Sequence, residues 1–140
     1  MCGIVGYIGP REATRLVFEG LQRLEYRGYD SAGIATVQDG FIAIRRAEGK
    51  LANLGQLMAE QPINGNTAIG HTRWATHGAP SQRNAHPHTD CSGDIALIQN
   101  GIVENFLDLR MKLGSEGHEF SSETDTEVIV HLVEKYMAEG

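Results

Sequence analysis

Apolar and polar positions alternate in a way that divides the first half of the chain into a strand, a helix and a hairpin. The run from Cys2 to Ile8 is typical of a buried strand that begins at the second residue. Apolar residues then recur at helical intervals from Ala13 to Leu24, which predicts an amphipathic helix. Segments 32–38 and 41–47 flank Asp39-Gly40, a dipeptide that favours a two-residue hairpin turn.

The second half shows shorter elements around a long polar loop. Leucines and a methionine between 51 and 58 predict a short helix, and strands are expected at 67–72 and 94–99. Two helices follow, and Thr124-x-x-Glu127 is a capping box that predicts the start of the second. Its apolar face is expected to carry Val128, Leu132, Val133 and Tyr136. Strands in hairpin-like groups followed by helices indicate an α+β fold rather than a regular βαβ alternation.

Composition narrows the class of protein. The chain has 140 residues, the size of one domain, and a formal charge of −6 without any basic run, which argues against nucleic-acid binding. No apolar stretch is long enough for a membrane helix, and the first residues do not form a signal peptide. Two cysteines without an export signal predict reduced thiols and a cytoplasmic location.

Cys2 is the first residue that could carry chemistry. If Met1 is removed, Cys2 presents a thiol and a free α-amine on one residue. An α-amine has a pKa of about 7.7–8.0, so a neutral fraction can accept the thiol proton directly or through one water. The alternative is that Cys2 is simply a small residue in a buried strand.

The loop 73–93 is too long to be a passive connection. It begins inside His71-Thr72-Arg73-Trp74-Ala75-Thr76-His77-Gly78. The planar guanidinium of Arg73 could bind a carboxylate through two hydrogen bonds, and Thr76 and His77 could add further ones. A surface ion pair beside a packed Trp74 would explain the same residues.

Two later segments have both a structural and a chemical interpretation. Asn100-Gly101 could be an ordinary turn, or it could offer an amide and a backbone N–H to an oxyanion. Residues 122–125 are explained by helix capping, which we assign to Thr124. Asp125 could instead meet the ammonium group of a substrate.

A metal site was considered for the four histidines of the loop region and for Cys91. They are His71, His77, His86 and His88. Their spacing matches no standard zinc pattern, and Arg73 among them would repel a dication. The sequence therefore predicts no metal and no cofactor.

Taken together, these segments resemble the class II glutamine amidotransferases. The matching stretches are CGIVGYIG at 2–9, LEYRGYDSAG at 24–33, HTRWATHG at 71–78, NAHPH at 84–88, NGIVEN at 100–105 and SETDTEV at 122–128. They follow the family's order along the whole chain. The resemblance implies an N-terminal-nucleophile hydrolase fold, a four-layer αββα sandwich. Residues 1–140 would be the N-terminal part of the glutaminase domain, incomplete at its C-terminus and without the sugar isomerase domains.

The resemblance also assigns catalytic roles. Cys2 corresponds to the nucleophile and its own amine to the base. Asn100 and Gly101 match the oxyanion hole. The thiolate would attack the glutamine side chain, release ammonia and form a γ-glutamyl thioester that water hydrolyses to glutamate.

Glutamine itself would be held by a second set of residues. Arg73, Thr76 and His77 match the residues that bind its α-carboxylate, and Asp125 with the backbone of Gly101 matches those that bind its ammonium. Trp74 matches a residue that shields the reacting amide, and Arg27 lies in the segment that packs around the cysteine. Gln99 replaces a histidine that is usual in the family, and strand alternation predicts that it points away from the oxyanion.

Within the family, the motifs are closest to enzymes that convert fructose 6-phosphate into glucosamine 6-phosphate. In those enzymes the ammonia passes to a C-terminal sugar-phosphate isomerase domain, and the full protein is expected to be a homodimer. Two alternatives remain open on the sequence: a glutaminase that feeds another acceptor, and an inactive fragment.

Overall fold

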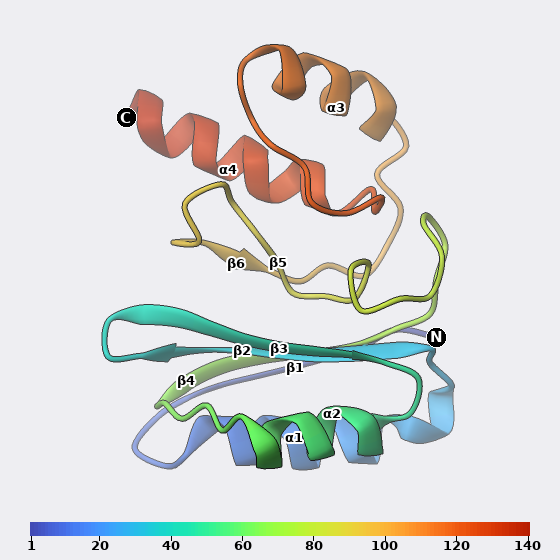
Figure 1. Ribbon diagram of the computed structural model, residues 1–140, viewed down its shortest axis with the longest axis vertical. Coiled ribbons are helices and arrows are strands. Elements are labelled where there is room, and N and C mark those ends of the chain that lie inside the picture. The colour runs from blue at the N-terminus through green and yellow to red at the C-terminus, as the bar shows by residue number, and fades with distance from the viewer.

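A four-stranded antiparallel sheet lies at the centre of the protein (Figure 1). The computed structural model describes all residues from Met1 to Gly140. The strands are β1 (Gly3–Ile8), β2 (Ser31–Gln38), β3 (Phe41–Glu48) and β4 (Thr67–Arg73), in the spatial order β1-β4-β2-β3. The N-terminal strand therefore lies at one edge, next to β4.

The predicted hairpin is confirmed, and its turn explains the register of β2 and β3. Asp39 and Gly40 have φ values of 52° and 81°, as a two-residue type I′ turn requires. The pairing runs from Gln38 opposite Phe41 to Ser31 opposite Glu48 without a bulge.

Two helices cover one face of the sheet, and the apolar core lies beneath them (Figure 1). They are α1 (Ala13–Arg23) and α2 (Leu51–Glu60), both where the hydrophobic pattern predicts them. The buried core consists of Ala13, Val17, Leu21, Ala32, Ile34, Leu51, Leu54, Ile63 and Ala68. Burial of the valine, leucine and isoleucine side chains contributes about 1.5–3 kcal/mol each, which holds the helices to the sheet.

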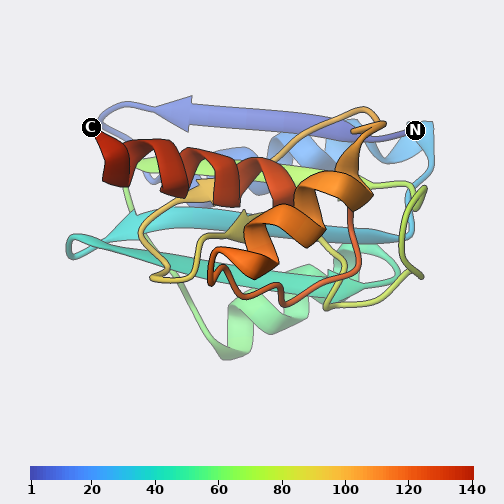
Figure 2. The same cartoon turned by 90° about the horizontal axis from the view of Figure 1, so that it is seen from above.

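The opposite face of the sheet is covered by a ribbon and two further helices (Figures 1 and 2). The ribbon pairs β5 (His88–Thr89) with β6 (Ala96–Leu97), and α3 (Phe106–Ser115) and α4 (Glu127–Glu139) form the outer layer. The order of layers is helices, sheet, ribbon and helices, as in the predicted αββα sandwich. The strand expected at 94–99 is too long, because only Ala96 and Leu97 pair with a neighbour.

The capping box predicted at Thr124 is wrong. Helix α4 begins at Glu127, and the Glu127 carboxylate accepts N–H groups from Ser121 at 2.6 Å and from Ser122 at 2.9 Å. The Thr124 hydroxyl faces His88 Nε2 at 2.8 Å. Thr124 thus makes a tertiary contact and Glu127 binds the turn before the helix, so neither side chain forms the capping box. Tyr136, expected on the apolar face of α4, is 60% exposed.

The layer between the sheet and α4 is polar but buried. The rings of His71 and His86 stack with their centroids 4.1 Å apart, and the ring of His88 packs at a tilt against His86 with the centroids 4.7 Å apart. The loop comes so close to the sheet that a Cβ on Gly33 would lie 1.9 Å from the carbonyl oxygen of His86. Gly33 is thus the point at which the loop rests on β2.

None of the helices combines the length and the apolar character needed to cross a lipid bilayer.

Replacing Gly33 by alanine should destabilise the fold by about 1–3 kcal/mol, because the new methyl group must displace backbone rather than a movable side chain. Urea unfolding followed by circular dichroism would measure the change. Gly6→Ala is the matched control, since its Cβ meets nothing closer than the carbonyl oxygen of Ala68 at 4.0 Å. Equal stability of the two variants would contradict the close approach.

Candidate active site

Pairing of β1 with β4 brings Cys2 to the end of β4. Gly3 lies opposite Thr72, and its N–H donates to the Thr72 hydroxyl at 3.1 Å. One residue earlier, Cys2 Sγ accepts the N–H of Trp74 at 3.2 Å. The terminus of the chain is therefore held at a defined place in the fold.

Asn100 reaches Cys2 from the other side, and His71 fixes its orientation. Asn100 Nδ2 donates to the carbonyl oxygen of Cys2 at 3.3 Å, while Oδ1 lies 2.7 Å from His71 Nε2. Burial lowers the pKa of His71 to about 4, so the ring is neutral at pH 7. A neutral ring that donates from Nε2 holds Asn100 Oδ1 and turns the NH₂ group toward Cys2.

His71 was not among the site residues that the sequence predicts. It was considered only as a metal ligand, although it opens the segment that contains Arg73 and His77. Its contact with Asn100 joins residues on two separate segments, and no local pattern reveals such a contact.

A cavity of about 250 Å³ opens beside Cys2. Six of the predicted site residues line it: Cys2, Arg73, Trp74, Thr76, Gly101 and Asp125. The other lining residues are His71, His86, Gln99, Ile102 and Thr126. A larger hollow of about 600 Å³ lies at the far end of the sheet, around Gln38 and Asn64, but it offers no nucleophile.

Arg73 is 3% exposed and partly engaged by its own loop. Its guanidinium donates to the carbonyl oxygens of His77, of Gly78 at 3.2 Å and of Ala79 at 3.3 Å. Three of the five guanidinium N–H groups are thus used, and two remain for a ligand. Burial lowers the pKa of Arg73, while Asp30 and Asp125 act in the opposite direction. The group remains a cation in the cavity wall.

Asp125 provides the opposite charge in the same cavity. Its side chain is 5% exposed, and Oδ2 accepts the N–H of Val103 at 2.7 Å. Oδ1 lies 3.9 Å from Nδ1 of His77, whose ring packs edge-on against Phe106. His77 does not line the cavity itself and reaches it through Asp125.

The segment around Arg27 surrounds the first residue. The Met1 ammonium donates to the carbonyl oxygens of Arg27 at 3.1 Å and Gly28 at 3.0 Å, and the Arg27 guanidinium contacts the Met1 sulfur. Arg27 therefore packs against the residue that precedes Cys2. Trp74 is 55% exposed at the cavity rim.

One expectation about this region is wrong. Gln99 lines the cavity and accepts the Thr126 hydroxyl at 2.9 Å, because β6 ends at Leu97 and strand alternation no longer applies. Cys91 does not join the histidines of the loop. Its sulfur faces His131 Nδ1 at 3.7 Å instead.

Comparison with known proteins shows the family to which the chain belongs. The family model described as the glutamine amidotransferase domain matches residues 42–139, more than half of the chain. The chain belongs to the glutamine amidotransferase family. The family model does not include Cys2. The position of Cys2 beside Asn100 is therefore an observation that comes from the structure and not from the family match.

Curated relatives of this amidotransferase domain are named glutamine–fructose-6-phosphate aminotransferase (isomerizing). The protein of Pyrococcus horikoshii is 58% identical over 96% of the chain, and that of Zymomonas mobilis is 56% identical over 100%. The chain spans 23% of the length of each. A solved glutamine phosphoribosylpyrophosphate amidotransferase from B. subtilis superposes with a TM-score of 0.80 and 29% identity, over 96% of this chain and 29% of the other. The fold is thus that of an N-terminal-nucleophile hydrolase.

The neutral histidines make the stability of the domain depend on pH. Burial lowers the pKa of His71 to about 4 and that of His88 to about 3, against 6.5 in the unfolded chain. Between pH 6.5 and 4 the unfolded chain binds protons that the fold excludes. As the pH falls, protonation of the unfolded chain at His71 and at His88 should therefore lower the free energy of unfolding. The contribution of each residue is up to about 1.4 kcal/mol per pH unit.

Urea titrations at pH 7, 6, 5 and 4.5 would measure this slope. His71→Gln should reduce it by the contribution of one proton. His131 does not contribute to this slope, because its pKa is raised in the folded protein. Its stabilising contribution is fully present below pH 6.5 and is lost only as the pH rises through the raised pKa. A stability that does not change from pH 6.5 to 4.5 would show that the fold accepts protonated imidazoles.

Proposed function

We propose that the chain hydrolyses glutamine to glutamate and ammonia, with Cys2 as the nucleophile. The observation that carries this proposal is the composition of one small cavity. It contains a thiol, a buried cation at Arg73 and a buried anion at Asp125. A free α-amino acid carries the complementary pair of charges, and its side chain can then extend toward the sulfur.

Glutamine recognition divides between the two charged residues. The Arg73 guanidinium would bind the α-carboxylate, with Thr76 in the same cavity wall. His77 would act through its contact with Asp125. Asp125 and the carbonyl oxygen of Gly101 would accept the α-ammonium. Trp74 at the rim would cover the reacting amide and exclude water.

The base in this mechanism is the α-amine of Cys2 after Met1 has been removed. In the chain with Met1, the Cys2 nitrogen is an amide and cannot accept a proton. The neutral amine would take the thiol proton, and the thiolate would then attack the side-chain carbonyl carbon of glutamine. Asn100 Nδ2 and the N–H of Gly101 would stabilise the resulting oxyanion.

Collapse of this tetrahedral intermediate breaks the carbon–nitrogen bond. The protonated amine returns its proton to the leaving nitrogen, so ammonia departs and a γ-glutamyl thioester remains. The amine next deprotonates a water molecule, which attacks the thioester. Glutamate leaves and the thiol is restored, so no cofactor is consumed.

The ammonia acceptor is inferred from the relatives. Identity of 58% to an enzyme named for fructose 6-phosphate, against 29% to one named for phosphoribosylpyrophosphate, favours the sugar phosphate. We infer that a sugar-phosphate isomerase domain in a longer, homodimeric protein uses the ammonia to make glucosamine 6-phosphate. The reduced thiol that this chemistry requires agrees with a cytoplasmic location.

Removal of Met1 should switch the activity on. We expect chain without Met1 to release glutamate from glutamine and to be labelled at Cys2 by a diazoketone analogue of glutamine. Chain that retains Met1 should turn over at least about 10³-fold more slowly. Met1 converts the α-amine of Cys2 into an amide and also obstructs the approach of glutamine to the sulfur. Intact mass, peptide mapping and a glutamate assay on both forms would measure this.

Cys91→Ala is the control for the labelling experiment, since it removes the other thiol and should leave the label at Cys2. Label at Cys91 with Cys2 unmodified would refute the assignment of the nucleophile. Equal turnover of the two forms would instead remove the α-amine from the role of base.

Asn100→Ala should lower kcat by about 10²–10³-fold, the usual effect of losing one oxyanion donor, with a smaller change in KM. Asn64→Ala is the matched control, because Asn64 is an exposed asparagine that borders the hollow at the far end of the sheet. Steady-state glutamate release would be measured for both. An unchanged kcat in Asn100→Ala would place the oxyanion elsewhere in the cavity.

A further inference from the structure

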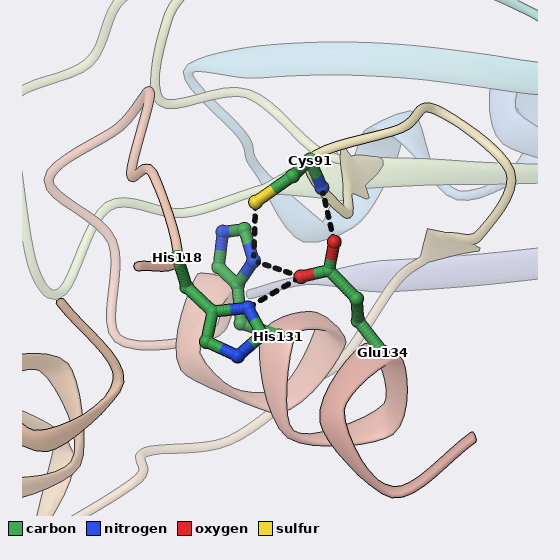
Figure 3. Close-up of side chains that lie close together, drawn as sticks. All are labelled: Cys91, His118, His131 and Glu134. Carbon is green, nitrogen blue, oxygen red and sulfur yellow. Dashed lines mark hydrogen bonds and ion pairs between the residues drawn. The ribbon is translucent and has the colours of Figure 1, made fainter. Parts of the chain in front are cut away.

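A second group of reactive side chains lies outside the cavity, on the side of α4 (Figure 3). It consists of Cys91, His118, His131 and Glu134, which we call the outer cluster. Cys91 follows β5, His118 follows α3, and the other two residues occupy one face of α4. None of the four lines the cavity beside Cys2.

The outer cluster is tightly convergent. Its four ligand atoms all lie within 4.8 Å of one another. Glu134 Oε2 is 2.6 Å from His118 Nδ1 and 3.0 Å from His131 Nδ1. His131 Nδ1 is in turn 3.7 Å from Cys91 Sγ. In Figure 3 the sulfur, the two imidazoles and the carboxylate point toward one common centre.

Contacts behind Cys91, His131 and Glu134 orient these three groups toward that centre. Cys91 Sγ accepts the N–H of Glu119 at 3.3 Å, and the N–H of Cys91 donates to Glu134 Oε1 at 3.1 Å. The second nitrogen of His131, Nε2, lies 3.7 Å from the Glu127 carboxylate. Metal-binding histidines commonly have such a carboxylate behind them, which fixes the tautomer and raises the basicity of the ligand nitrogen.

We propose that the outer cluster binds a divalent transition metal, Zn²⁺ by preference, through Cys91 Sγ, the Nδ1 atoms of His118 and His131, and Glu134 Oε2. Zinc bonds of about 2.0–2.3 Å place tetrahedral ligands roughly 3.3–3.8 Å apart. The two shortest separations are below this range and the largest is above it. Metal binding would therefore require Glu134 Oε2 to move away from the two imidazole nitrogens.

The ligand types decide which metal fits. Thiolate and imidazole select zinc and similar transition metals, whereas magnesium and calcium require a shell of oxygen atoms. Without a metal, Nδ1–H of each imidazole would donate a hydrogen bond to the Glu134 carboxylate. The metal would replace these protons and neutralise the thiolate that it coordinates. The His131 side chain is 1% exposed, whereas Cys91 is exposed, so a metal could enter the outer cluster from the Cys91 side.

The place of the outer cluster indicates a structural role. Four protein ligands leave no open position for a substrate, as in closed zinc sites. The ligands join the turn after β5, the segment after α3 and helix α4. A bound metal would therefore clamp the outer helices to the ribbon that lies over the sheet.

Cobalt(II) is the most direct probe, because tetrahedral cobalt with a thiolate ligand gives strong visible bands and a near-ultraviolet charge-transfer band. We expect purified, chelator-treated chain to bind one equivalent of Co²⁺ with a Kd below about 1 µM, and Zn²⁺ to displace it. Zn²⁺ should also raise the melting temperature. Absence of these bands at up to about 100 µM Co²⁺ would overturn the proposal.

Variants identify the ligands. Cys91→Ser should abolish the charge-transfer band and weaken binding at least about 100-fold, and because Cys91 is exposed this change should preserve the fold. His118→Gln should weaken binding similarly, and Glu127→Gln, behind His131, by about 10–100-fold. Circular dichroism of each variant would confirm that it is folded.

Cys2→Ala is the matched control, because it removes the only other thiol and should keep the full spectrum. A band that persists in Cys91→Ser and disappears in Cys2→Ala would place the metal at the active-site thiol and refute the outer cluster. A rise in melting temperature with Zn²⁺ that is equal in wild type and Cys91→Ser would also refute it.

Discussion

The antiparallel register between β1 and β4 is the constraint on which the active site depends. The nucleophile proposed here stands at the start of the chain, where backbone freedom is normally greatest. Six consecutive residue pairs, from Gly3 opposite Thr72 to Ile8 opposite Thr67, remove that freedom. A slip of one residue would turn every side chain of β1 to the other face and would move Cys2 away from the N–H of Trp74.

The polar layer above the sheet is the second requirement. Neutral imidazoles pack against one another where charged ones could not, and this allows the loop to approach Gly33 closely. His71 uses the same neutrality to hold Asn100. The buried histidines therefore lower the stability of the fold at acidic pH. The same neutral layer orients the Asn100 amide group that faces Cys2.

The turn before α4 joins the cavity to the outer cluster. Glu127 fixes Ser121 and Ser122 through its carboxylate, and burial works against the low pKa, of about 2, that its hydrogen-bond partners give it. Asp125 lies on the cavity side of this turn, and His131 lies one turn of helix beyond Glu127. A metal at the outer cluster would stabilise α4 and so hold in place the carboxylate proposed to bind the substrate ammonium.

The sequence by itself determined the features that depend on neighbours along the chain. Periodicity located β1, both helices under the sheet and β4, and Asp39-Gly40 located the hairpin. The motifs resemble those of glutamine amidotransferases, and the comparison showed that the chain belongs to this family. The motifs also contain the six predicted site residues that line the cavity beside Cys2. Each of these signals is local or is carried by a contiguous motif.

Only the tertiary structure decided the rest. The strand at 94–99 is short because its partner β5 has two residues, and Thr124 does not cap α4 because its hydroxyl meets His88, 36 positions away. Cys91 was grouped by sequence with nearby histidines, yet it meets His131 and Glu134, 40 and 43 positions away. Contacts between distant segments are set by packing in three dimensions, and no periodicity along the chain encodes them.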